Sequence, residues 1–524
     1  MDKIKQFFKK NWLNAIIIFT YMIAAVYMAQ FHELWTDEAQ SWLIARDSSV
    51  GRIFSYIRYE GTPPLWVLII KVFISCGLTV EKFYLLPIIF MSLGLIFLYT
   101  KFDIPWYIKI LFPFTYFAFY QSAIVIRSYS LVLLGISMLF YYFPKRYENT
   151  YKYLLSLLFF MGISIHTCFL TAGFFAVTLV FLKQDYSNLD NKTKSRMKIL
   201  FGILIIAFVL MFILLCPTKY TGNFGSGGNS YLPYTIGEAT IANNNAIVQA
   251  IATIYIVSLI IYILVKKYKE LDNKQDISKE ILKFLTVAPL LIIFLAVRAH
   301  VRYFAIPFYI IFLYFLNNKK YLIIRLSIVF ILIVQIVWNI QSCYIDYYEK
   351  YAAGKDVAQF LVDINYEEKI VDAVDYSVVN INPYFDKNIF YHTNQAEFAY
   401  YSWSLKDFHP DPEEVLANKA DIYVIPVIIH GIDGNKAIIE NSNNVRIILT
   451  NLDYNEYKVY SIDGNVVIKG HVDAVNTYLI CVNKKVQEEM KQKNLNLKEE
   501  DRVFYINNIR REPQKIIDYS QVNK

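Results

Sequence analysis

Ionisable side chains are almost absent from the middles of the long apolar runs in this sequence, and those that occur are expected at one end of the runs. This set consists of Asp37, Glu38, Glu60, Arg127, His166, Arg298, His300 and Arg302. Carboxylates and histidines can take up protons, and arginines can bind phosphate through two parallel hydrogen bonds. Polar groups at one level above apolar helices suit a substrate with a charged headgroup and a lipid tail. A proton- or ion-coupled carrier usually needs ionisable groups at mid-membrane depth instead.

The acids stand in residues 32–66, directly after the first apolar run. There the sequence "HELWTDEAQSWLIARDSSVGRIFSYIRYEGTPPLW" interleaves charged residues with tryptophans. We interpret the segment as an amphipathic stretch that lies on the bilayer surface. Structural roles are open as well: Asp37 and Glu38 could favour a helix N-terminus with Thr36 as its N-cap. Glu60 could pair with Arg58.

The composition indicates a membrane protein. Of 524 residues, 56% are hydrophobic and only 18% are charged, whereas soluble proteins are about one quarter charged. The net charge of +8 does not indicate a nucleic-acid partner, because the lysines and arginines fall mostly in short loops, where they mark topology. The sequence shows no glycine-rich phosphate loop, no metal-type Cys/His cluster and no internal repeat. Its five cysteines are too dispersed to indicate a disulfide framework.

The apolar runs and the charges between them predict the topology. Runs recur near 12–30, 64–76, 83–100, 104–121, 128–143, 153–182, 199–216, 246–265, 284–297, 303–316 and 321–340. A full span needs about 20 residues, so we assign 64–76 to the interface and divide 153–182 into a hairpin that turns at His166. This choice places the basic loops in the cytoplasm, as the positive-inside rule requires. It predicts about 11 transmembrane helices, a cytoplasmic N-terminus and a C-terminus outside.

The composition and hydrophobic pattern of the sequence change after residue 343. Short β-rich runs such as "ADIYVIPVII" and "VRIILT" alternate with helical stretches such as "GKDVAQFLVDI", a pattern typical of a small α/β domain. We therefore predict an all-α polytopic membrane domain at 1–343, with interfacial helices in its first outer loop. An extracytoplasmic α/β domain at 344–492 and a polar C-terminal tail at 493–524 follow it.

Three motifs resemble those of a known family. The stretch "WTDEAQSWLIARDSS", followed by "RYEGTPPLW", resembles the first outer loop of the GT-C glycosyltransferases, and more narrowly of the bacterial protein-mannosyltransferase-like and aminoarabinose-transferase-like enzymes. "IRSYSLVLL" at 126–134 resembles their Arg-x-Tyr-x-Leu motif, and "VRYFAIPF" at 301–308 resembles their late Arg-Tyr motif. The resemblance covers roughly residues 10–340. Thr62 stands where relatives usually have histidine, so no role of that histidine is carried over.

The resemblance implies an inverting transfer of a sugar from a polyprenyl-phosphate donor to an acceptor hydroxyl on the outer face of the cell membrane. The acceptor could be a lipid, a glycan or a protein. It implies no firm cofactor and leaves a divalent metal open. We expect Asp37 to be the general base, because its short side chain stands where the first span meets the surface segment, and Glu38 to support it.

The remaining roles follow the same resemblance. The donor phosphate would be bound by Arg127, Arg302 and Tyr303, and further substrate contacts would come from Glu60, His166, His300 and Arg298. Arginine suits a phosphate leaving group, which needs cationic partners more than a general acid. Arg127 could instead anchor lipid headgroups, and His166 could be a structural histidine. Two other functions stay open: a lipid or polysaccharide transporter or flippase, and a membrane scaffold that displays the C-terminal domain.

Overall fold

The computed structural model describes residues 2–500 except for the segments 217–231, 242–244, 271–273, 292–300, 374–375, 391–398, 401–411, 434–435, 441 and 469–470. The predicted Arg298 and His300 therefore lie outside the described residues. The chain divides into two compact units. The first comprises residues 1–29, 54–66 and 84–340, and the second comprises residues 30–53, 67–83 and 341–524.

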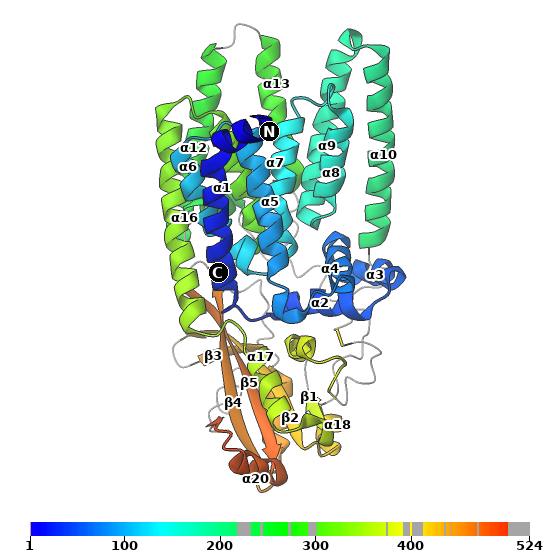
Figure 1. Ribbon diagram of the computed structural model, residues 1–524, viewed down its shortest axis with the longest axis vertical. Coiled ribbons are helices and arrows are strands. Elements are labelled where there is room, and N and C mark those ends of the chain that lie inside the picture. The colour runs from blue at the N-terminus through cyan, green and yellow to red at the C-terminus, as the bar shows by residue number, and fades with distance from the viewer. Residues whose placement is uncertain are drawn as a thin grey trace. The chain divides into compact units, whose positions relative to one another are not determined.

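The first unit is helical. Its helices are α1 (Asp2–Ala29), α5 (Leu85–Lys101), α6 (Trp106–Leu111), α7 (Val132–Tyr142), α8 (Thr150–Met161), α9 (Ile165–Asp185), α10 (Asn191–Leu215), α11 (Leu232–Thr240), α12 (Ala246–Glu270), α13 (Lys274–Leu285) and α15 (Ala305–Asn317). Helix α16 (Leu322–Tyr348) begins in this unit and ends in the second. Helices α1, α5 and α7 pack side by side in sequence order (Figure 1). Helices suit apolar sequences of this kind because they satisfy every backbone polar group internally.

Six helical segments of the described chain are long and apolar enough to cross a membrane. They are Asn11–Ala29, Val80–Lys101, Ile165–Asn188, Asn191–Leu215, Ala246–Glu270 and Leu322–Tyr348. Four apolar helices are shorter: Leu65–Ser75, Ser128–Tyr142, Thr150–Met161 and Arg302–Asn317. The chain is therefore a mainly α, polytopic membrane protein. Length and composition support six spans among the described residues rather than the predicted eleven, and the predicted run 284–297 lies partly outside these residues. The predicted division of 153–182 is confirmed, because α8 and α9 are separated at 162–164, but the predicted turn at His166 is wrong, since His166 lies in the first turn of α9.

The apolar run 104–121 does not form the single helix that the sequence predicts. Helix α6 ends at Leu111, and a 3-10 turn η3 (Phe112–Phe114), a π-helical turn η4 (Tyr120–Ile124) and a second 3-10 turn η5 (Ser128–Leu131) follow before α7. Pro113 lies inside η3. Proline has no backbone N–H, and its ring clashes with the preceding turn, so α6 cannot continue through it.

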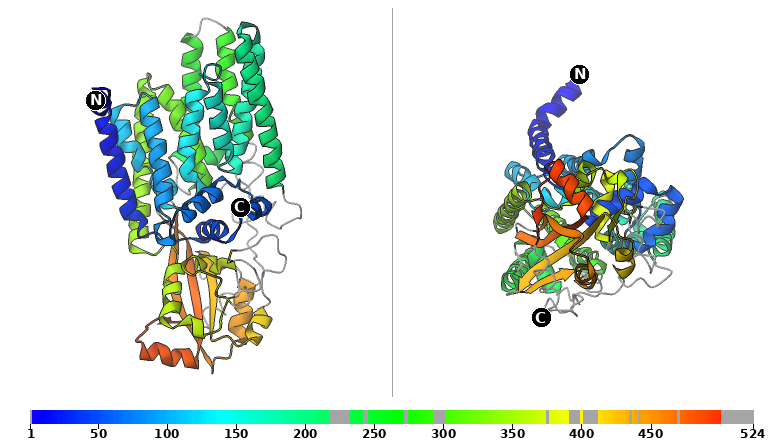
Figure 2. Two further views of the ribbon diagram at one scale, coloured as in Figure 1. Left: turned by 45° about the vertical axis from the view of Figure 1, so that its right-hand side comes forward. Right: turned by 90° about the horizontal axis from the view of Figure 1, so that it is seen from below.

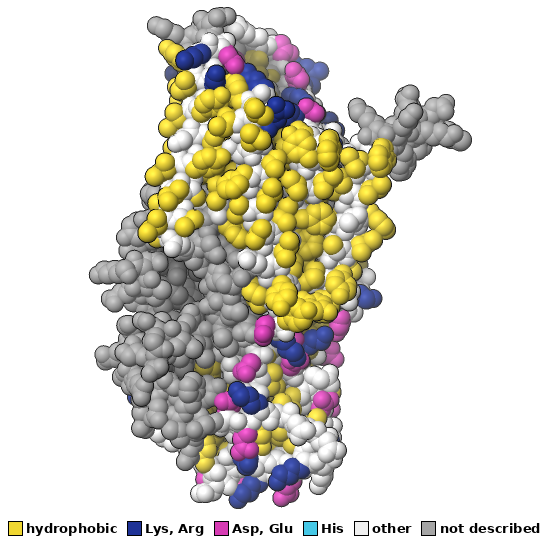
Figure 3. Space-filling model, turned by 90° about the vertical axis from the view of Figure 1, so that its left-hand side faces the viewer, with side chains coloured by type: hydrophobic (Ala, Val, Ile, Leu, Met, Phe, Trp, Pro, Cys, Tyr) yellow, Lys and Arg dark blue, Asp and Glu magenta, His cyan; other side chains and the backbone are white. Residues whose placement is uncertain are grey.

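The apolar surface of the helical unit is extensive. Figure 3 shows hydrophobic side chains over a broad face of the helices. Helix α16 alone exposes Leu322, Leu326, Phe330, Ile333 and Val337. A contiguous apolar surface of this size is unfavourable in water and is matched by the hydrocarbon core of a bilayer.

The second unit contains a mixed β-sheet, which confirms the predicted C-terminal α/β fold. Its strands are β1 (Val371–Ala373), β2 (Ile422–Asp433), β3 (Lys436–Glu440), β4 (Tyr457–Ile468), β5 (His471–Asn483) and β6 (Lys498–Glu499). The order is β1-β2-β5-β4-β6, with β3 also paired to β2. Only β1 and β2 are parallel among the pairs of described strands. The long strands β4 and β5 run side by side (Figures 1 and 2). Strand β6 lies within the predicted polar tail.

Both faces of this sheet are covered. Along β2, Ile422 and Val424 pack into one hydrophobic core and Tyr423 and Ile425 into another, because successive strand residues point to opposite faces. Helices α17 (Gly354–Asp363) and α20 (Lys484–Gln492) supply the first core, and α19 (Ser442–Asn451), together with α18 (Pro412–Ala417), supplies the second. A small sheet that buries both faces is a rigid support for the segments attached to it.

The first predicted outer loop consists of short helices. These are α2 (Thr36–Asp47), α3 (Val50–Tyr56), the 3-10 turn η1 (Ile57–Tyr59) and α4 (Leu65–Ser75). Residues 30–53 and 67–83 belong to the second unit, with the C-terminal sheet. Helix α4 has 11 residues, too few to cross a bilayer, which agrees with its predicted interfacial role.

Candidate active site

Helix α2 carries the two adjacent acids. Its N-cap is Trp35, so the suggestion that Thr36 is the N-cap is wrong. The Glu38 carboxylate accepts a hydrogen bond from the Trp35 backbone N–H through Oε2 at 2.7 Å. An acid at the third helical position satisfies a backbone donor next to the positive end of the helix dipole. Glu38 therefore stabilises the start of α2.

The second oxygen of Glu38 faces a histidine. Glu38 Oε1 lies 3.3 Å from His32 Nε2, and Asp346 Oδ2 lies 3.0 Å from His32 Nδ1. The side chains of all three residues are at most 1% exposed. The ring of Tyr351 packs on the imidazole, with centroids 4.2 Å apart. We call His32, Glu38 and Asp346 the histidine–carboxylate triad. It joins the start of α2 to the end of α16.

The charge of this triad follows from its geometry. Burial alone would lower the pKa of His32, but the carboxylates of Glu38 and Asp346 outweigh that effect and raise the pKa to about 10. His32 is therefore an imidazolium at neutral pH, and both of its nitrogens donate. Buried charges of this kind are stable only as long as every partner is present. Sequence reasoning missed His32 and Asp346, because no local pattern places the end of the last span beside the first loop.

Asp37 has different surroundings from its neighbour. Consecutive helical residues point about 100° apart, so the Asp37 side chain is directed away from the triad. Asp37 is half-buried, whereas Glu38 is fully buried. The Asp37 backbone carbonyl accepts a hydrogen bond from Ser41 Oγ at 3.0 Å. Of the two acids, Asp37 is the one that a substrate can reach.

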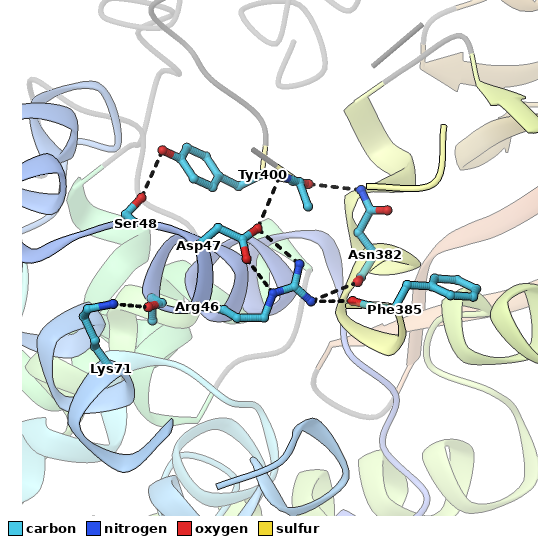
Figure 4. A network of polar contacts seen from close by, with 9 residues as sticks. Arg46, Asp47, Ser48, Lys71, Asn382, Phe385 and Tyr400 are labelled. Atoms are coloured by element: carbon cyan, nitrogen blue, oxygen red, sulfur yellow. Dashed lines mark hydrogen bonds and ion pairs between the residues drawn. The ribbon is translucent and has the colours of Figure 1, made fainter. Parts of the chain in front are cut away.

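The other end of α2 is fixed by an arginine (Figure 4). Arg46 Nε lies 2.6 Å from Asp47 Oδ1, and its Nη1 donates to the carbonyls of Phe385 at 2.6 Å and Asn382 at 3.4 Å. Asp47 Oδ2 in turn accepts from the backbone N–H of Ala399 at 3.3 Å. Planar, bidentate contacts of this kind are what arginine supplies and lysine does not. The end of α2 is thereby fixed to two segments of the C-terminal region.

A tyrosine extends the same network. Tyr400 Oη accepts hydrogen bonds from Ser48 Oγ at 3.0 Å and from Arg52 Nε at 2.9 Å (Figure 4 shows the first). Lys71 Nζ donates to the Ala45 carbonyl at 3.1 Å. With the triad at its start and this network at its end, α2 is held at both ends. A helix fixed in this way can present Asp37 in one geometry, as a catalytic group requires.

Glu33 is a second buried acid near the triad in sequence. Burial and the Asp356 carboxylate raise the pKa of Glu33 to about 7, against the opposing effect of Lys350 and Lys355. Burial and the nearby acids, Glu33 foremost, also hold the pKa of the Tyr384 hydroxyl well above its ordinary value. Glu33 thus changes its charge near neutral pH while His32 keeps its own.

The predicted headgroup residues of the first unit stand at the starts of three helices. Arg127 is the N-cap of η5, which runs into α7. His166 lies in the first turn of α9. Arg302 lies in the 3-10 turn η7 (Val301–Phe304), which runs into α15. Each of these starts carries the partial positive charge of a helix N-terminus.

Tyr303 joins these helix starts. Its ring stacks on His166 with centroids 4.0 Å apart and meets Tyr129 edge-on at 5.7 Å. The Arg302 guanidinium lies 5.4 Å from the centroid of the Tyr303 ring. The structure therefore brings together His166, Arg302 and Tyr303, with Arg127 two residues from Tyr129. Sequence reasoning missed Tyr129, although it is the tyrosine of the quoted Arg-x-Tyr-x-Leu motif.

We call Arg127, His166, Arg302 and Tyr303 the arginine cluster, and we include Arg127 because Tyr129, two residues further on, contacts Tyr303. Two guanidinium groups and several helix N-termini favour an anion, because backbone N–H groups and fixed charges are oriented before the ligand arrives. The His166 side chain is buried and tightly stacked, so it suits a positioning role. The cluster has the chemistry of a phosphate site.

The other predicted residues are distributed differently. Glu60 belongs to the first unit and accepts a hydrogen bond from Tyr56 Oη at 2.9 Å. Asp37 and Glu38 belong to the second unit, whereas the arginine cluster belongs to the first. Among the described residues, no group of three or more histidine, cysteine, aspartate or glutamate side chains could hold a metal ion.

A small apolar cavity also occurs in the first unit, with a volume of about 10 Å³. Its lining residues are Thr240, Phe308, Ile311, Phe312, Phe315, Ile328, Ile331 and Leu332. They come from α11, α15 and α16 and include no ionisable group. The cavity is about the size of a single water molecule and is too small to hold a hydrocarbon chain.

Comparison of the chain with protein-family models and with curated proteins gave no match.

Proposed function

We propose that this chain is an integral membrane glycosyltransferase of the GT-C type. It transfers a sugar from a polyprenyl-phosphate donor to an acceptor hydroxyl on the outer face of the cell membrane. The observation that carries the proposal is the arginine cluster, in which three helix starts are linked through the Tyr303 ring and two of them carry an arginine; groups of this kind favour an anion.

The proposed reaction assigns a role to each group. The acceptor oxygen attacks the anomeric carbon while its proton passes to the Asp37 carboxylate, acting as general base. The bond between the anomeric carbon and the phosphate oxygen breaks with inversion, and its electron pair stays on the phosphate. Arg127 and Arg302 stabilise that leaving group, which needs no proton to depart. Glu38 does not take part directly, since the triad and the helix cap occupy both of its oxygens.

The proposal includes the topology that the charges predict. The basic loops lie in the cytoplasm and the C-terminal sheet lies outside, with about 11 crossings in total. The eleven crossings are then the six long helices, the three short apolar helices Ser128–Tyr142, Thr150–Met161 and Arg302–Asn317, the interrupted run 104–121 and the run 284–297. Interrupted helices are tolerated at membrane depth where they are buried in protein, and the segment between α6 and α7 is buried in this way.

The test is turnover of defined donors. The purified chain, reconstituted in liposomes, is incubated with a panel of polyprenyl-phosphate sugars, and released polyprenyl phosphate is measured. At least one donor should be consumed, with a product of inverted anomeric configuration. If a donor crosses between leaflets but stays intact, the chain is a flippase and the proposal is wrong. If no donor is consumed or moved, the assignment to polyprenyl-phosphate sugars is wrong.

A further inference from the structure

The stretch between α6 and α7 is irregular and wholly buried. Every residue from Thr115 to Ile126 is at most 6% exposed, yet the backbone there passes through turns and one π-helical turn in place of a regular helix. This stretch ends at Arg127, which belongs to the arginine cluster. We call residues 115–126 the irregular segment.

Side chains from two other helices satisfy the carbonyls of the irregular segment. Tyr309 Oη of α15 donates to the Phe117 carbonyl at 3.0 Å, and Tyr21 Oη of α1 donates to the Ala118 carbonyl at 2.9 Å. Ser122 Oγ lies 3.3 Å from Tyr309 Oη. All of these groups are buried. The two tyrosines thus supply hydrogen bonds that a regular helix would supply itself.

A third contact comes from the backbone of α16. The Tyr116 N–H donates to the Gln335 carbonyl at 3.0 Å. Unsatisfied backbone groups cost several kcal/mol in hydrocarbon, so irregular backbone persists there only where neighbouring groups compensate it. π-Helical turns and interrupted membrane helices occur frequently at functional sites. The compensation by three separate helices indicates that the path of this segment serves a purpose.

The residues of helix α15, which contacts the irregular segment, suggest what the path of this segment is for. Arg302 lies in the 3-10 turn that opens α15, and Tyr309 follows about two helical turns later on the same helix. The Tyr309 hydrogen bonds therefore connect the helix that begins at Arg302 with the segment that ends at Arg127. The Tyr129–Tyr303 contact, with ring centroids 5.7 Å apart, is a second connection between the residues that follow Arg127 and those that follow Arg302.

We propose that Tyr309 is a positioning residue for the donor phosphate: its hydroxyl holds the irregular segment against α15 and thereby fixes the separation of Arg127 and Arg302. Tyr21 assists from α1. This inference rests on the proposed function, because it takes the arginine cluster as the phosphate site. The ligand chemistry is a phosphate monoester or diester on an isoprenoid chain, for which two arginines at a fixed separation give more affinity than either alone.

The experiment compares single-oxygen deletions in the full chain. Tyr309→Phe and Tyr21→Phe each remove one hydroxyl from the irregular segment. Tyr153→Phe is the matched control, because Tyr153 Oη also makes a buried hydrogen bond, to Thr178 Oγ1 at 2.8 Å, but between α8 and α9. Binding of a short-chain polyprenyl phosphate is measured directly, together with the apparent unfolding temperature, so that a loss of stability is separated from a loss of affinity.

Tyr309→Phe should weaken phosphate binding about tenfold, and Tyr21→Phe less, while Tyr153→Phe binds as the wild type does. In turnover assays the donor KM should rise with little change in kcat. The effect of Tyr309→Phe should largely vanish in an Arg127→Ala background, since non-additivity identifies residues that act through one another. If Tyr309→Phe does not fold, Tyr21→Phe in both backgrounds decides the question.

The outcomes separate this inference from the proposed function. If the wild type binds and cleaves the donor but both tyrosine variants match Tyr153→Phe, the positioning role is wrong and the proposed function stands. If the effects of Tyr309→Phe and Arg127→Ala on affinity simply add, Tyr309 does not act through Arg127. If the wild type neither binds polyprenyl phosphate nor cleaves a donor, the proposed function falls, and the positioning role with it.

Discussion

At the scale of single residues, burial gives two adjacent acids different surroundings. Glu38 is enclosed by His32, Asp346 and the Trp35 backbone, whereas Asp37 is half-buried. The sequence predicts that the two acids differ, because neighbours on a helix diverge by about 100°. It does not predict the complete triad, because Asp346, which binds the other nitrogen of His32, lies 314 residues further along the chain.

Single substitutions of these two acids should distinguish the residue that stabilises the fold from the residue proposed to act in catalysis. Glu38→Gln removes one charge from the buried triad and should lower the free energy of unfolding by about 3–5 kcal/mol. Asp37→Asn should change it by less than about 0.5 kcal/mol, because Asp37 stands outside the triad. Unfolding of both purified variants in one detergent checks this. A stable Glu38→Gln protein, or an unstable Asp37→Asn protein, would contradict the division of roles.

His32 should make the stability depend on alkaline pH. Its pKa of about 10 in the folded protein lies above the ordinary value of about 6.5. The stabilisation is therefore fully present below pH 6.5 and is lost as pH rises towards 10, at up to about 1.4 kcal/mol per pH unit. Thermal unfolding between pH 6.5 and 10 should show this slope in the wild type and lose it in His32→Gln. The same slope in both proteins would contradict the assignment.

Glu33 should make the stability of the protein depend on pH in a separate range, below that of His32. Its pKa of about 7 in the folded protein exceeds the ordinary value of about 4.3, so the folded state holds this proton more tightly. Stability should fall as pH rises from about 4.5 to 7. Glu33→Gln should flatten this range and leave the range above pH 7 unchanged. A variant that retains the slope between pH 4.5 and 7 would show that another group causes it.

At the scale of elements, the sequence predicts most segments correctly and fails where tertiary contacts override a local pattern. The break in 153–182 and the shortness of helix α4 follow from length and charge. The run 104–121 reads as one apolar span, but Pro113 ends the helix, and Tyr21 and Tyr309 compensate the irregular backbone from other helices. Hydropathy cannot reveal that compensation. For the same reason the sequence identifies the arginines but not Tyr129 as the contact between their helices.

Helix α2 should depend on Arg46 for its fixed position. Arg46→Ala removes the donors to Phe385 and Asn382 and leaves Asp47 without this ion-pair partner, at a cost of about 1–3 kcal/mol. Hydrogen exchange at residues 382–390 and at the end of α2 should accelerate. The exposed Lys458, whose ion pair is with Glu499 on the sheet edge, supplies the control Lys458→Ala. Equal exchange in both variants would mean that Arg46 does not fix this end of α2.

At the scale of the whole molecule, the distribution of basic residues predicts which parts face the cytoplasm. Basic loops place residue 188 inside, and charge parity places the C-terminal sheet outside. In a background without the native cysteines, Asn188→Cys should resist an impermeant thiol reagent in intact cells, while Asn455→Cys should react. Both positions are exposed in the structure, so differences in labelling report on sidedness. Labelling of Asn188→Cys with protection of Asn455→Cys would reverse the proposed topology.

The central claim is that Asp37 and the arginine cluster transfer a sugar from a polyprenyl-phosphate donor. It is tested most directly by measuring the turnover of the consumed donor by four proteins in parallel: wild type, Asp37→Asn, Arg302→Ala and Arg325→Ala. Arg325 is an exposed arginine on α16 and serves as the charge-matched control. Asp37→Asn should lose about 10²–10⁴-fold in kcat, Arg302→Ala about 10²-fold or more in kcat/KM, and Arg325→Ala little. Wild-type turnover that persists in both Asp37→Asn and Arg302→Ala would contradict the account.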